Sequence, residues 1–403
     1  MEYYDPKERC RGWLVYDGVG ARLAAGGCRM DADLTQDTLK ALAQRMTLKQ
    51  RVLGLNVDGA TCGIAYDPRG PHRREVLHRF MAFLRDELRT RFSMGCDMGT
   101  RFGELEEIAL ELGIGSPKAA IQAAQGIPAD EFRRRMDLLR VPVGVLTLGR
   151  RRAGHVVGHA ALQAAQQADL DPATMSVTLQ GFGNLGRAAA LALLDADVRV
   201  TAVGDAFGSI VDPHGLDLGR MLEIEQQRPV HTLLPSAMRL PRGGVLDLPT
   251  DVLILAAGED ALTPQQAAVL PAKAVVVGAN CGLSPNVEQL LHDRGVLVVP
   301  GFIGGIGGSA SMEALFGPVR TPTAPEVLDG VAAMTRELVH DVLDASRTRG
   351  ISPRQVAFDI AACAVTDPGA PPYGKSPYRL RGPAPRGRRN APAVLLQTSK
   401  GTA

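Results

Sequence analysis

The residues whose spacing most directly suggests chemistry form a glycine-rich segment in the middle of the chain. Gly181, Gly183 and Gly186 make the pattern GxGxxG, with Asn184 and Leu185 between the last two glycines. A β-rich run precedes the segment and a helical stretch follows it. In that context the first glycine makes a tight turn, the second lets the backbone approach a pyrophosphate, and the third lets the helix pack on the strand. Because the helix start presents free N–H groups to phosphates, the segment predicts a dinucleotide site.

An acidic residue follows at the distance expected for the ribose of such a cofactor. Asp205 ends the next β-rich run, 24 residues after Gly181, and no basic side chain stands in the three positions after it. A carboxylate there accepts hydrogen bonds from a ribose diol and repels a 2′-phosphate. The pattern therefore predicts NAD rather than NADP. A tight turn without a ligand is the alternative interpretation.

A lysine interrupts the buried face of a predicted helix near the N-terminus. The helix is expected to begin after Thr35, and Lys49 falls in register with its apolar stripe, which contains Leu39, Leu42, Met46 and Leu53. Lysine is rarely buried without a partner. Lys49 therefore either extends along the helix to the surface or enters a cleft that holds an anion.

A carboxylate stands between glycines just before another helical run. Asp97 lies two residues from both Gly95 and Gly99. It is either a turn or helix-capping carboxylate or a proton-transfer group held on a constrained backbone.

The elements that must position these residues alternate along the chain. Between residues 175 and 300, β-rich runs alternate with helical stretches, which predicts βαβ units and a parallel sheet. Residues 1–150 mix short strands and helices, and two more helical stretches follow before residue 367. We therefore expect an α/β protein with more than one domain, in agreement with its length of 403 residues.

Composition and charge exclude several classes of protein. The chain is 45% hydrophobic and 22% charged, with a net charge of only +2, so we do not expect a nucleic-acid partner. No apolar run reaches the roughly 18 residues of a membrane span, and the polar N-terminus does not resemble a secretory signal. The six cysteines are widely spaced, which predicts neither a metal site nor a disulfide framework and favours the cytoplasm.

The C-terminal segment differs from the rest. Residues 367–403 are rich in Pro, Gly and Arg, and from residue 368 onward there are seven basic side chains and no acidic one. Such a composition buries too little to offset its ordering entropy, so we expect a disordered basic tail.

These pieces together resemble the glutamate/leucine/phenylalanine/valine dehydrogenase family from about residue 20 to residue 365. The matching elements occur in the family's order: Gly26-Gly27-Cys28-Arg29-Met30, Met46-Thr47-Leu48-Lys49, Gly54-Leu55-Asn56, Asp97-Met98-Gly99-Thr100, Gln180 to Gly186, Gly278-Ala279-Asn280 and Gly307-Gly308.

The resemblance implies an N-terminal substrate and oligomerisation domain (1–148) and a doubly wound Rossmann domain that binds NAD (149–322). It also implies C-terminal helices (323–366) that pack back on the first domain, and a homo-oligomer. The resemblance implies that Lys49 binds the substrate α-carboxylate beside Gly26 and Gly27, and that Asp97 transfers protons. Ala257, Gly258 and Asn280 join the glycine loop in binding the cofactor.

The departures from the family pattern concern polar site residues. The family's catalytic lysine, which activates the water that adds to the imine, is Thr61 here. A threonine hydroxyl donates or accepts a hydrogen bond but is no base near neutral pH. Three further polar positions hold glycine, namely Gly154, Gly301 and Gly305. Ala25 replaces the lysine by which glutamate-specific members hold the side-chain carboxylate, which disfavours glutamate and 2-oxoglutarate.

Two functions fit these observations. The first is a divergent NAD-dependent oxidoreductase that moves a hydride between the nicotinamide and an amino-acid-like substrate other than glutamate, or the imine or 2-oxo form of that substrate. Cys62 or Cys96 could serve in its proton transfer, or both could be small buried hydrophobic residues. The second is a non-catalytic NAD-binding paralogue that acts as a sensor or partner subunit.

Overall fold

The computed structural model describes residues 1–224, 228–258, 260–280 and 282–380, and it contains two compact units. The first comprises Met1–Arg134 with Ala364–Ser376, and the second Arg135–Cys363 with residues 377–380. Residues 135–148 therefore belong with the second unit, although the sequence suggested a boundary after residue 148. The described residues contain no helix long and apolar enough to cross a membrane, and no group of three or more potential metal ligands.

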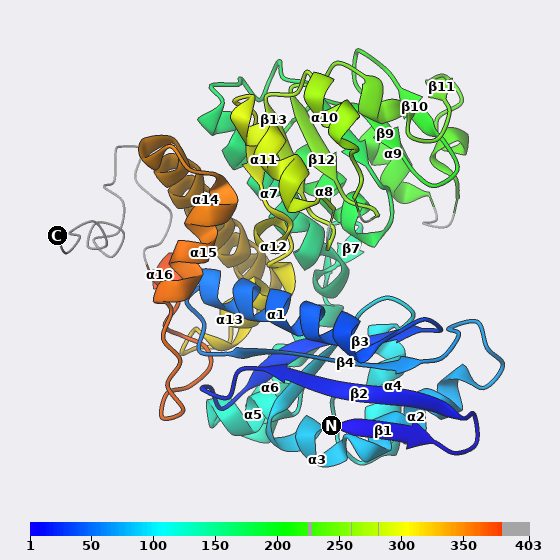
Figure 1. Ribbon diagram of the computed structural model, residues 1–403, viewed down its shortest axis with the longest axis vertical. Helices are drawn as coiled ribbons and strands as arrows, with labels where there is room; N and C mark the ends of the chain where they lie inside the picture. Colours follow the sequence, from blue (N-terminus) through cyan, green and yellow to red (C-terminus); the bar gives the residue numbers. More distant parts are fainter. Residues whose placement is uncertain (225–227, 259, 281, 381–403) are drawn as a thin grey trace. The chain divides into compact units, whose positions relative to one another are not determined.

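The first unit is built on a five-stranded mixed sheet of order β1-β2-β4-β3-β5 (Figure 1). Its strands are β1 (Glu2–Asp5), β2 (Cys10–Asp17), β3 (Ala24–Asp31), β4 (Asp58–Ala65) and β5 (Phe92–Cys96). Strand β3 pairs in parallel with both β4 and β5, whereas β1, β2 and β4 are joined by antiparallel pairing. Its helices are α1 (Gln36–Val52), α2 (Arg73–Phe83), α3 (Arg85–Thr90), α4 (Phe102–Glu111), α5 (Ala120–Gln125) and the start of α6 (Ala129–Asp137).

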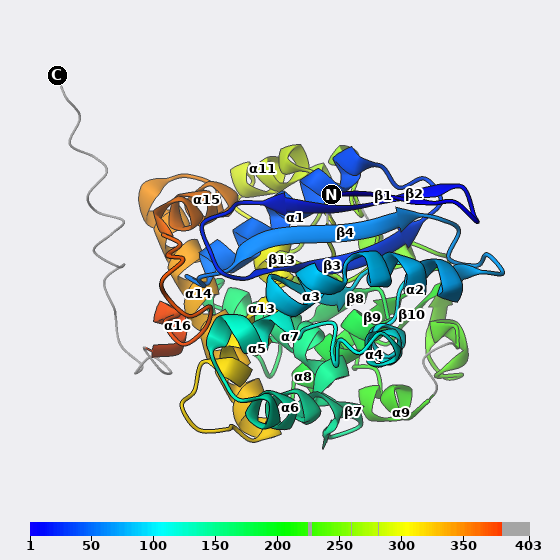
Figure 2. The same ribbon diagram turned by 90° about the horizontal axis from the view of Figure 1, so that it is seen from below.

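The two faces of this sheet carry different helices (Figures 1 and 2). Helices α2, α3 and α4 cover one face and share a core with Cys28, Cys62 and Met94 of the strands. Helix α1 packs on the other face, where the missing Cβ of Gly59 brings β4 against Ala43 and Thr47. Side chains alternate along a strand. Strand residues that adjoin a core residue in the sequence therefore point to the opposite face, the one that carries α1.

Helix α1 begins where the sequence predicts. Thr35 caps it, and its side chain accepts a hydrogen bond from the Thr38 N–H at 3.1 Å. Leu39 and Leu42 of the predicted stripe are buried, and Lys49 is buried with them. Lys49 lies in the last turn of the helix.

The second unit confirms the predicted parallel sheet. Strands β9, β8, β12, β13 and β14 are parallel neighbours, β10 pairs antiparallel with β9, and β11 pairs antiparallel with β10. The seven strands are β8 (Val177–Gln180), β9 (Val200–Gly204), β10 (Ser209–Val211), β11 (Met238–Leu240), β12 (Val252–Leu255), β13 (Ala274–Val277) and β14 (Leu297–Val299), and β6 (Pro142–Val143) pairs separately with β7 (Leu146–Thr147).

Helices flank this sheet and continue to the C-terminal part of the unit. They are α7 (Leu148–Gln167), α8 (Asn184–Leu194), α9 (Leu218–Glu223), α10 (Pro264–Val269), α11 (Pro285–Asp293), α12 (Gly301–Gly304), α13 (Gly307–Phe316), α14 (Ala324–Arg349), α15 (Pro353–Cys363) and α16 (Pro377–Leu380). A capping box at Thr323 begins α14, and Gly350 ends it in the left-handed conformation. The two predicted C-terminal helices are thus confirmed, and both fall within the second unit.

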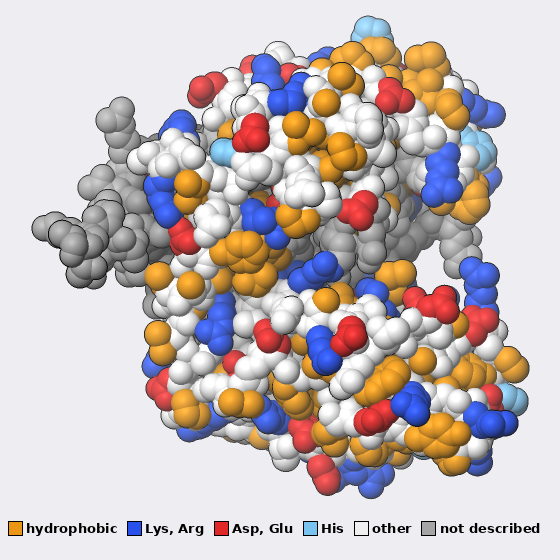
Figure 3. Space-filling view, viewed as in Figure 1, with side chains coloured by type: hydrophobic (Ala, Val, Ile, Leu, Met, Phe, Trp, Pro, Cys, Tyr) orange, Lys and Arg blue, Asp and Glu red, His pale blue; other side chains and the backbone are white. Residues whose placement is uncertain are grey.

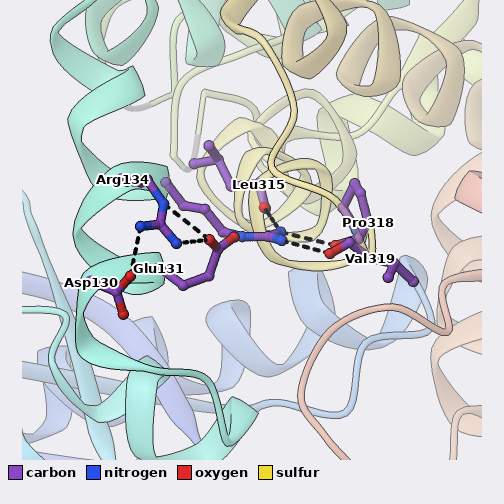
Figure 4. Close-up of polar contacts among 7 residues, drawn as sticks. Asp130, Glu131, Arg134, Leu315, Pro318 and Val319 are labelled. Atoms are coloured by element: carbon purple, nitrogen blue, oxygen red, sulfur yellow. Dashed lines mark hydrogen bonds and ion pairs between the residues drawn. The ribbon is translucent and has the colours of Figure 1, made fainter.

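Helix α6 contains the boundary between the units (Figure 4). Arg134 pairs with Asp130 at 2.6 Å and Glu131 at 2.7 Å within the helix. The next residue, Arg135, is buried and donates to the carbonyl oxygens of Leu315 at 2.6 Å, Pro318 at 3.0 Å and Val319 at 3.1 Å. Adjacent arginines thus stabilise different parts of the chain.

The expectation of a disordered segment from residue 367 is wrong for its first part. The Asn56 side-chain amide donates to the carbonyl oxygens of Asp367 at 2.8 Å and Ala370 at 2.9 Å. Gln125 exchanges hydrogen bonds with the backbone of Tyr373, whose side chain is buried. Side-chain amides therefore satisfy a non-helical backbone that composition alone suggested would stay in water. Residues 381–403 lie outside the described residues.

Charges of both signs are mixed on the face shown in Figure 3. Lys and Arg side chains there alternate with Asp and Glu, and no described part of that face is basic throughout.

Candidate functional site

The glycine-rich loop connects β8 to α8, as the sequence predicts. Gly181 has φ +103°, a conformation that favours glycine. A Cβ on Gly186 would lie 1.8 Å from the Gly181 carbonyl oxygen, so only glycine allows the helix to start this close to the strand. In contrast, a Cβ on Gly183 would have no atom within 4 Å. The loop is therefore tightly folded on the protein side and open beside Gly183, which fits a dinucleotide phosphate.

The other predicted cofactor residues lie at the same edge of the sheet. Gln180 at the end of β8 is in register with Gly204 of β9 and Leu255 of β12, and Leu255 is in register with Val277 of β13. Because these strands are parallel, the loops after them meet at their carboxyl ends. This edge gathers the glycine loop with Asp205, Ala257, Gly258 and Asn280.

Asp205 has a structural role in addition to its predicted one. Its Oδ1 accepts hydrogen bonds from the N–H groups of Phe207 at 2.8 Å and Gly208 at 3.0 Å, and its Oδ2 accepts one from Val230 at 2.8 Å. The carboxylate thus fixes the turn between β9 and β10. Its contact with a ribose remains a prediction.

In the first unit, the predicted substrate residues share the sheet face that carries α1. Thr61 stands between the core residues Ala60 and Cys62, and so it points to the opposite face. Ala25 follows the core residue Ala24 in the same way. A Cβ on Gly27 would lie 2.9 Å from the Asp97 Cβ, and one on Gly26 would lie 3.3 Å from the Thr61 Oγ1. The glycine pair therefore lies between Thr61 and Asp97.

Asp97 is held by an arginine to which the sequence assigned no role. The Arg29 Nε donates to the Asp97 Oδ2 at 3.1 Å, and the Arg29 side chain is only 8% exposed. The Thr100 hydroxyl donates to the Cys28 carbonyl oxygen at 2.7 Å and accepts from the Asp97 N–H at 3.2 Å. Because Arg29 follows Gly27 by two residues in one strand, side-chain alternation could have placed it on the face of Asp97.

Thr61 and Lys49 are both inaccessible to bulk solvent. Thr61 is 1% exposed, and its hydroxyl donates to the Ala60 carbonyl oxygen at 2.8 Å. Lys49 is 6% exposed, which is inconsistent with a side chain that extends into solvent. The Lys49 ammonium and the Thr61 hydroxyl are therefore both shielded from bulk solvent within the first unit.

The suggestion that Cys62 serves in proton transfer is wrong. Cys62 packs in the core, with its Sγ 3.6 Å from the Met94 Sδ, on the face opposite Thr61. Burial raises the pKa of the Cys62 thiol well above its ordinary value, which disfavours a thiolate. Cys96 is exposed, and a role for it remains a hypothesis.

The glycine at one departure from the family pattern has a packing reason. A Cβ on Gly154 in α7 would lie 2.2 Å from the Leu185 carbonyl oxygen and 2.6 Å from the Ala188 Cβ of α8. The two helices approach too closely for a threonine there. Gly301 begins the short helix α12, and Gly305 is the C-cap residue that follows it.

Comparison with known proteins identifies both parts of the chain. Residues 148–368 match the family model described as Glutamate/Leucine/Phenylalanine/Valine dehydrogenase, and residues 9–112 match its dimerisation domain. A glutamate dehydrogenase from Thermotoga maritima is 30% identical over 313 residues, 74% of this chain and 70% of that protein. An NADP-specific glutamate dehydrogenase from Saccharolobus shibatae is 25% identical over 74% of this chain and 68% of that protein.

A solved structure agrees with these matches. The hetero-hexameric glutamate dehydrogenase from Thermus thermophilus, in a leucine-bound form, has a TM-score of 0.70 and 28% identity, over 87% of this chain and 82% of that chain. The sheet topology, the glycine loop and the order of the motifs all agree with this likeness. The chain therefore belongs to the glutamate/leucine/phenylalanine/valine dehydrogenase family of nicotinamide-dependent oxidoreductases.

Proposed function

We propose that the protein is a divergent NAD-dependent oxidoreductase acting on an amino-acid-like substrate or its imine or 2-oxo form. The observation that carries the proposal is an intact dinucleotide loop in a chain that also retains buried Lys49 and the Arg29–Asp97 pair. Bound NAD would accept a hydride from the substrate Cα, and NADH would return it.

The residues of the first unit have separate roles in this proposal. Lys49 binds the substrate α-carboxylate as a buried ammonium. Asp97 holds or moves a proton while Arg29 fixes its orientation. Thr61 supplies only a hydrogen bond, so the activation of water or ammonia is weak.

A substrate that is already an imine or a carbonyl compound avoids this weakness. Hydride transfer needs orientation more than a protein base, whereas imine hydrolysis and amination need a base. We therefore propose that the physiological reaction requires little ammonia chemistry.

NAD is the proposed cofactor because Asp205 stands at the end of β9. A carboxylate at that position disfavours a 2′-phosphate. The match to a dimerisation domain supports a further proposal, that copies of this chain form a homo-oligomer.

A non-catalytic NAD-binding paralogue is the second candidate, favoured by the glycines at positions 154 and 305 where the family has polar residues. One experiment separates the two. Purified protein with NAD or NADH is tested by nicotinamide absorbance against panels of amino acids, 2-oxo acids and cyclic imines. Substrate-dependent turnover supports the enzyme, and cofactor binding without turnover of any panel member supports the paralogue.

A further inference from the structure

A second buried lysine approaches the candidate substrate face from a segment that the motifs do not include. Lys118 lies in the turn before α5 and is 6% exposed. The Pro117 carbonyl oxygen accepts a hydrogen bond from the Met94 N–H at 2.9 Å, which ties this turn to the edge of β5. The Lys118 N–H donates to the Ser116 Oγ at 3.2 Å. The backbone of the turn is thus fixed beside the strand.

The Lys118 ammonium lies on the same side of the sheet as Thr61. Its Nζ is 3.5 Å from the Ser93 Oγ and 4.0 Å from the position of a Cβ on Gly95. Both residues adjoin the core residue Met94 in β5, so their side-chain positions face away from the core. The Phe102 ring centroid lies 5.8 Å from the Nζ. The missing side chain of Gly95 leaves room beside the ammonium.

The register of the sheet places this ammonium next to a departure from the family pattern. Ser93, which the Nζ contacts, is paired with Ala25 of β3. Ala25 is the position at which glutamate-specific members of the family carry a lysine. The positive charge that is absent at position 25 of β3 is therefore present beside the neighbouring strand β5.

We infer that Lys118 determines side-chain specificity by binding an anionic group, a carboxylate, on the side chain of the substrate. The inference rests on the proposed function, because Lys49 must hold the α-carboxylate of the same molecule. An ammonium is a compact point charge with three donors, and its hydrogen bonds to a carboxylate are about twice as strong as neutral ones. Ala25 led us to expect that a carboxylate side chain on the substrate would be disfavoured. The inference changes that expectation, because Lys118 beside β5 would bind such a carboxylate.

Replacement of the missing catalytic amine is the less favoured role for Lys118. Thr61 lies on β4, and β3 separates β4 from β5. Two strand spacings amount to about 10 Å. The contact with Ser93 places the ammonium beside Ala25, the position of the family's side-chain lysine.

The test compares two acids that differ by one carboxylate. Glutarate and pentanoate have the same carbon number, and both offer a carboxylate to Lys49. Their dissociation constants are measured by calorimetry on the full chain in the presence of NADH, for the parent, Lys118→Met and the control Lys40→Met. Lys40 is a 53% exposed lysine on α1, so its replacement makes the same chemical change outside the site. Lys118→Gln replaces Lys118→Met if the latter does not unfold cooperatively.

The parent is expected to bind glutarate at least tenfold more tightly than pentanoate, since a charged hydrogen bond contributes about 1.5–3 kcal/mol. In Lys118→Met the preference disappears while the affinity for pentanoate stays within about twofold. Equal binding of the two acids by the parent, or a preference that survives in Lys118→Met, overturns the inference and leaves the proposed function intact. Failure of both acids to bind overturns the proposed substrate site and the inference together.

Discussion

At the scale of single residues, the site combines retained charges with one lost base. Lys49, Asp97 and Arg29 provide buried or half-buried charged groups, whereas Thr61 replaces an amine with a hydroxyl. The distinction matters because binding and orientation use fixed charges, but water activation uses a group that accepts a proton. The residues present therefore support substrate binding more strongly than amine release.

Replacement of Arg29 by Met tests its role as the positioning residue for Asp97. We expect the free energy of unfolding to fall by about 1–3 kcal/mol, because a carboxylate loses its buried hydrogen-bond partner. Turnover of an accepted substrate should fall at least tenfold through kcat. The control is Arg11→Met, because the Arg11 side chain is 66% exposed and its ion pair with Glu2 should contribute at most about 1 kcal/mol. If Arg29→Met has the stability and the kcat of the parent, Arg29 does not position Asp97.

The sequence predicts local residues of the site better than distant ones. The glycine loop is contiguous, so its spacing alone indicates its conformation and its ligand. Lys118 reaches Ser93 from 25 residues further along the chain, through a turn that no periodicity describes. The pairing of Arg29 with Asp97 likewise depends on strands β3 and β5 becoming neighbours. Such contacts follow from sheet register, which the sequence specifies only through the whole fold.

At the scale of elements, the β8–loop–α8 unit determines cofactor binding. Gly183 has an extended backbone, φ −80° and ψ −157°, and open space at its Cβ position. Gly183→Val is therefore expected to fold normally and to abolish NADH binding by occupying the place of the pyrophosphate. Calorimetric titration with NADH measures this effect. In the control Gly103→Val, also at an open Cβ position, NADH affinity should match that of the parent. Undiminished NADH binding by Gly183→Val would refute the location of the cofactor.

The close contact between α7 and α8 leads to a second prediction at this scale, which concerns stability. Gly154→Thr restores the residue type of the family but forces a Cβ to within 2.2 Å of the Leu185 carbonyl oxygen. We expect a loss of about 3 kcal/mol or more in unfolding free energy, because the overpacked atoms are backbone. Urea denaturation measures the loss, and Gly103→Thr should be much less affected. Retention of parental stability by Gly154→Thr would show that the helices separate readily.

At the scale of elements, the sequence-based prediction is least accurate for the C-terminal segment. Its composition predicts disorder, yet residues 367–376 contact Asn56 and Gln125 of the first unit. Composition describes what a segment lacks for a core of its own. It does not show which side chains elsewhere satisfy its backbone.

At the scale of the whole molecule, a buried histidine and a half-buried neighbour couple stability to pH. The His155 and His159 Nε2 atoms lie 3.1 Å apart, and the Arg336 Nε donates to the His159 Nδ1 at 3.2 Å. Burial, together with the smaller effect of nearby Arg151, lowers the pKa of His155 to about 4. Burial and the neighbouring His155 lower the pKa of His159 to about 2.

The sign of the resulting pH dependence follows from these lowered values. Between an unfolded pKa of about 6.5 and the folded values, the unfolded chain binds more protons, so stability falls as pH falls. His155 alone should remove about 2 kcal/mol between pH 7 and pH 5. Urea denaturation at the two pH values measures the loss, and a His155→Gln/His159→Gln double variant should lose much less. An identical pH dependence in parent and double variant would assign the effect to other groups.

The central claim is that hydride transfer persists while amine chemistry is weakened at Thr61. The most direct measurement is the rate of NADH oxidation by a cyclic imine, compared with the rate for the open-chain 2-oxo acid plus ammonia of the same carbon skeleton. Both reactions need the dinucleotide loop, Lys49 and Asp97, but only the second needs a base to form the imine. Loss of a general base costs about 10²–10⁴-fold, so the imine should react faster by at least about 10²-fold. Comparable rates, or strong oxidation of leucine, valine or phenylalanine by the unmodified protein, would show that a lysine at position 61 is not needed.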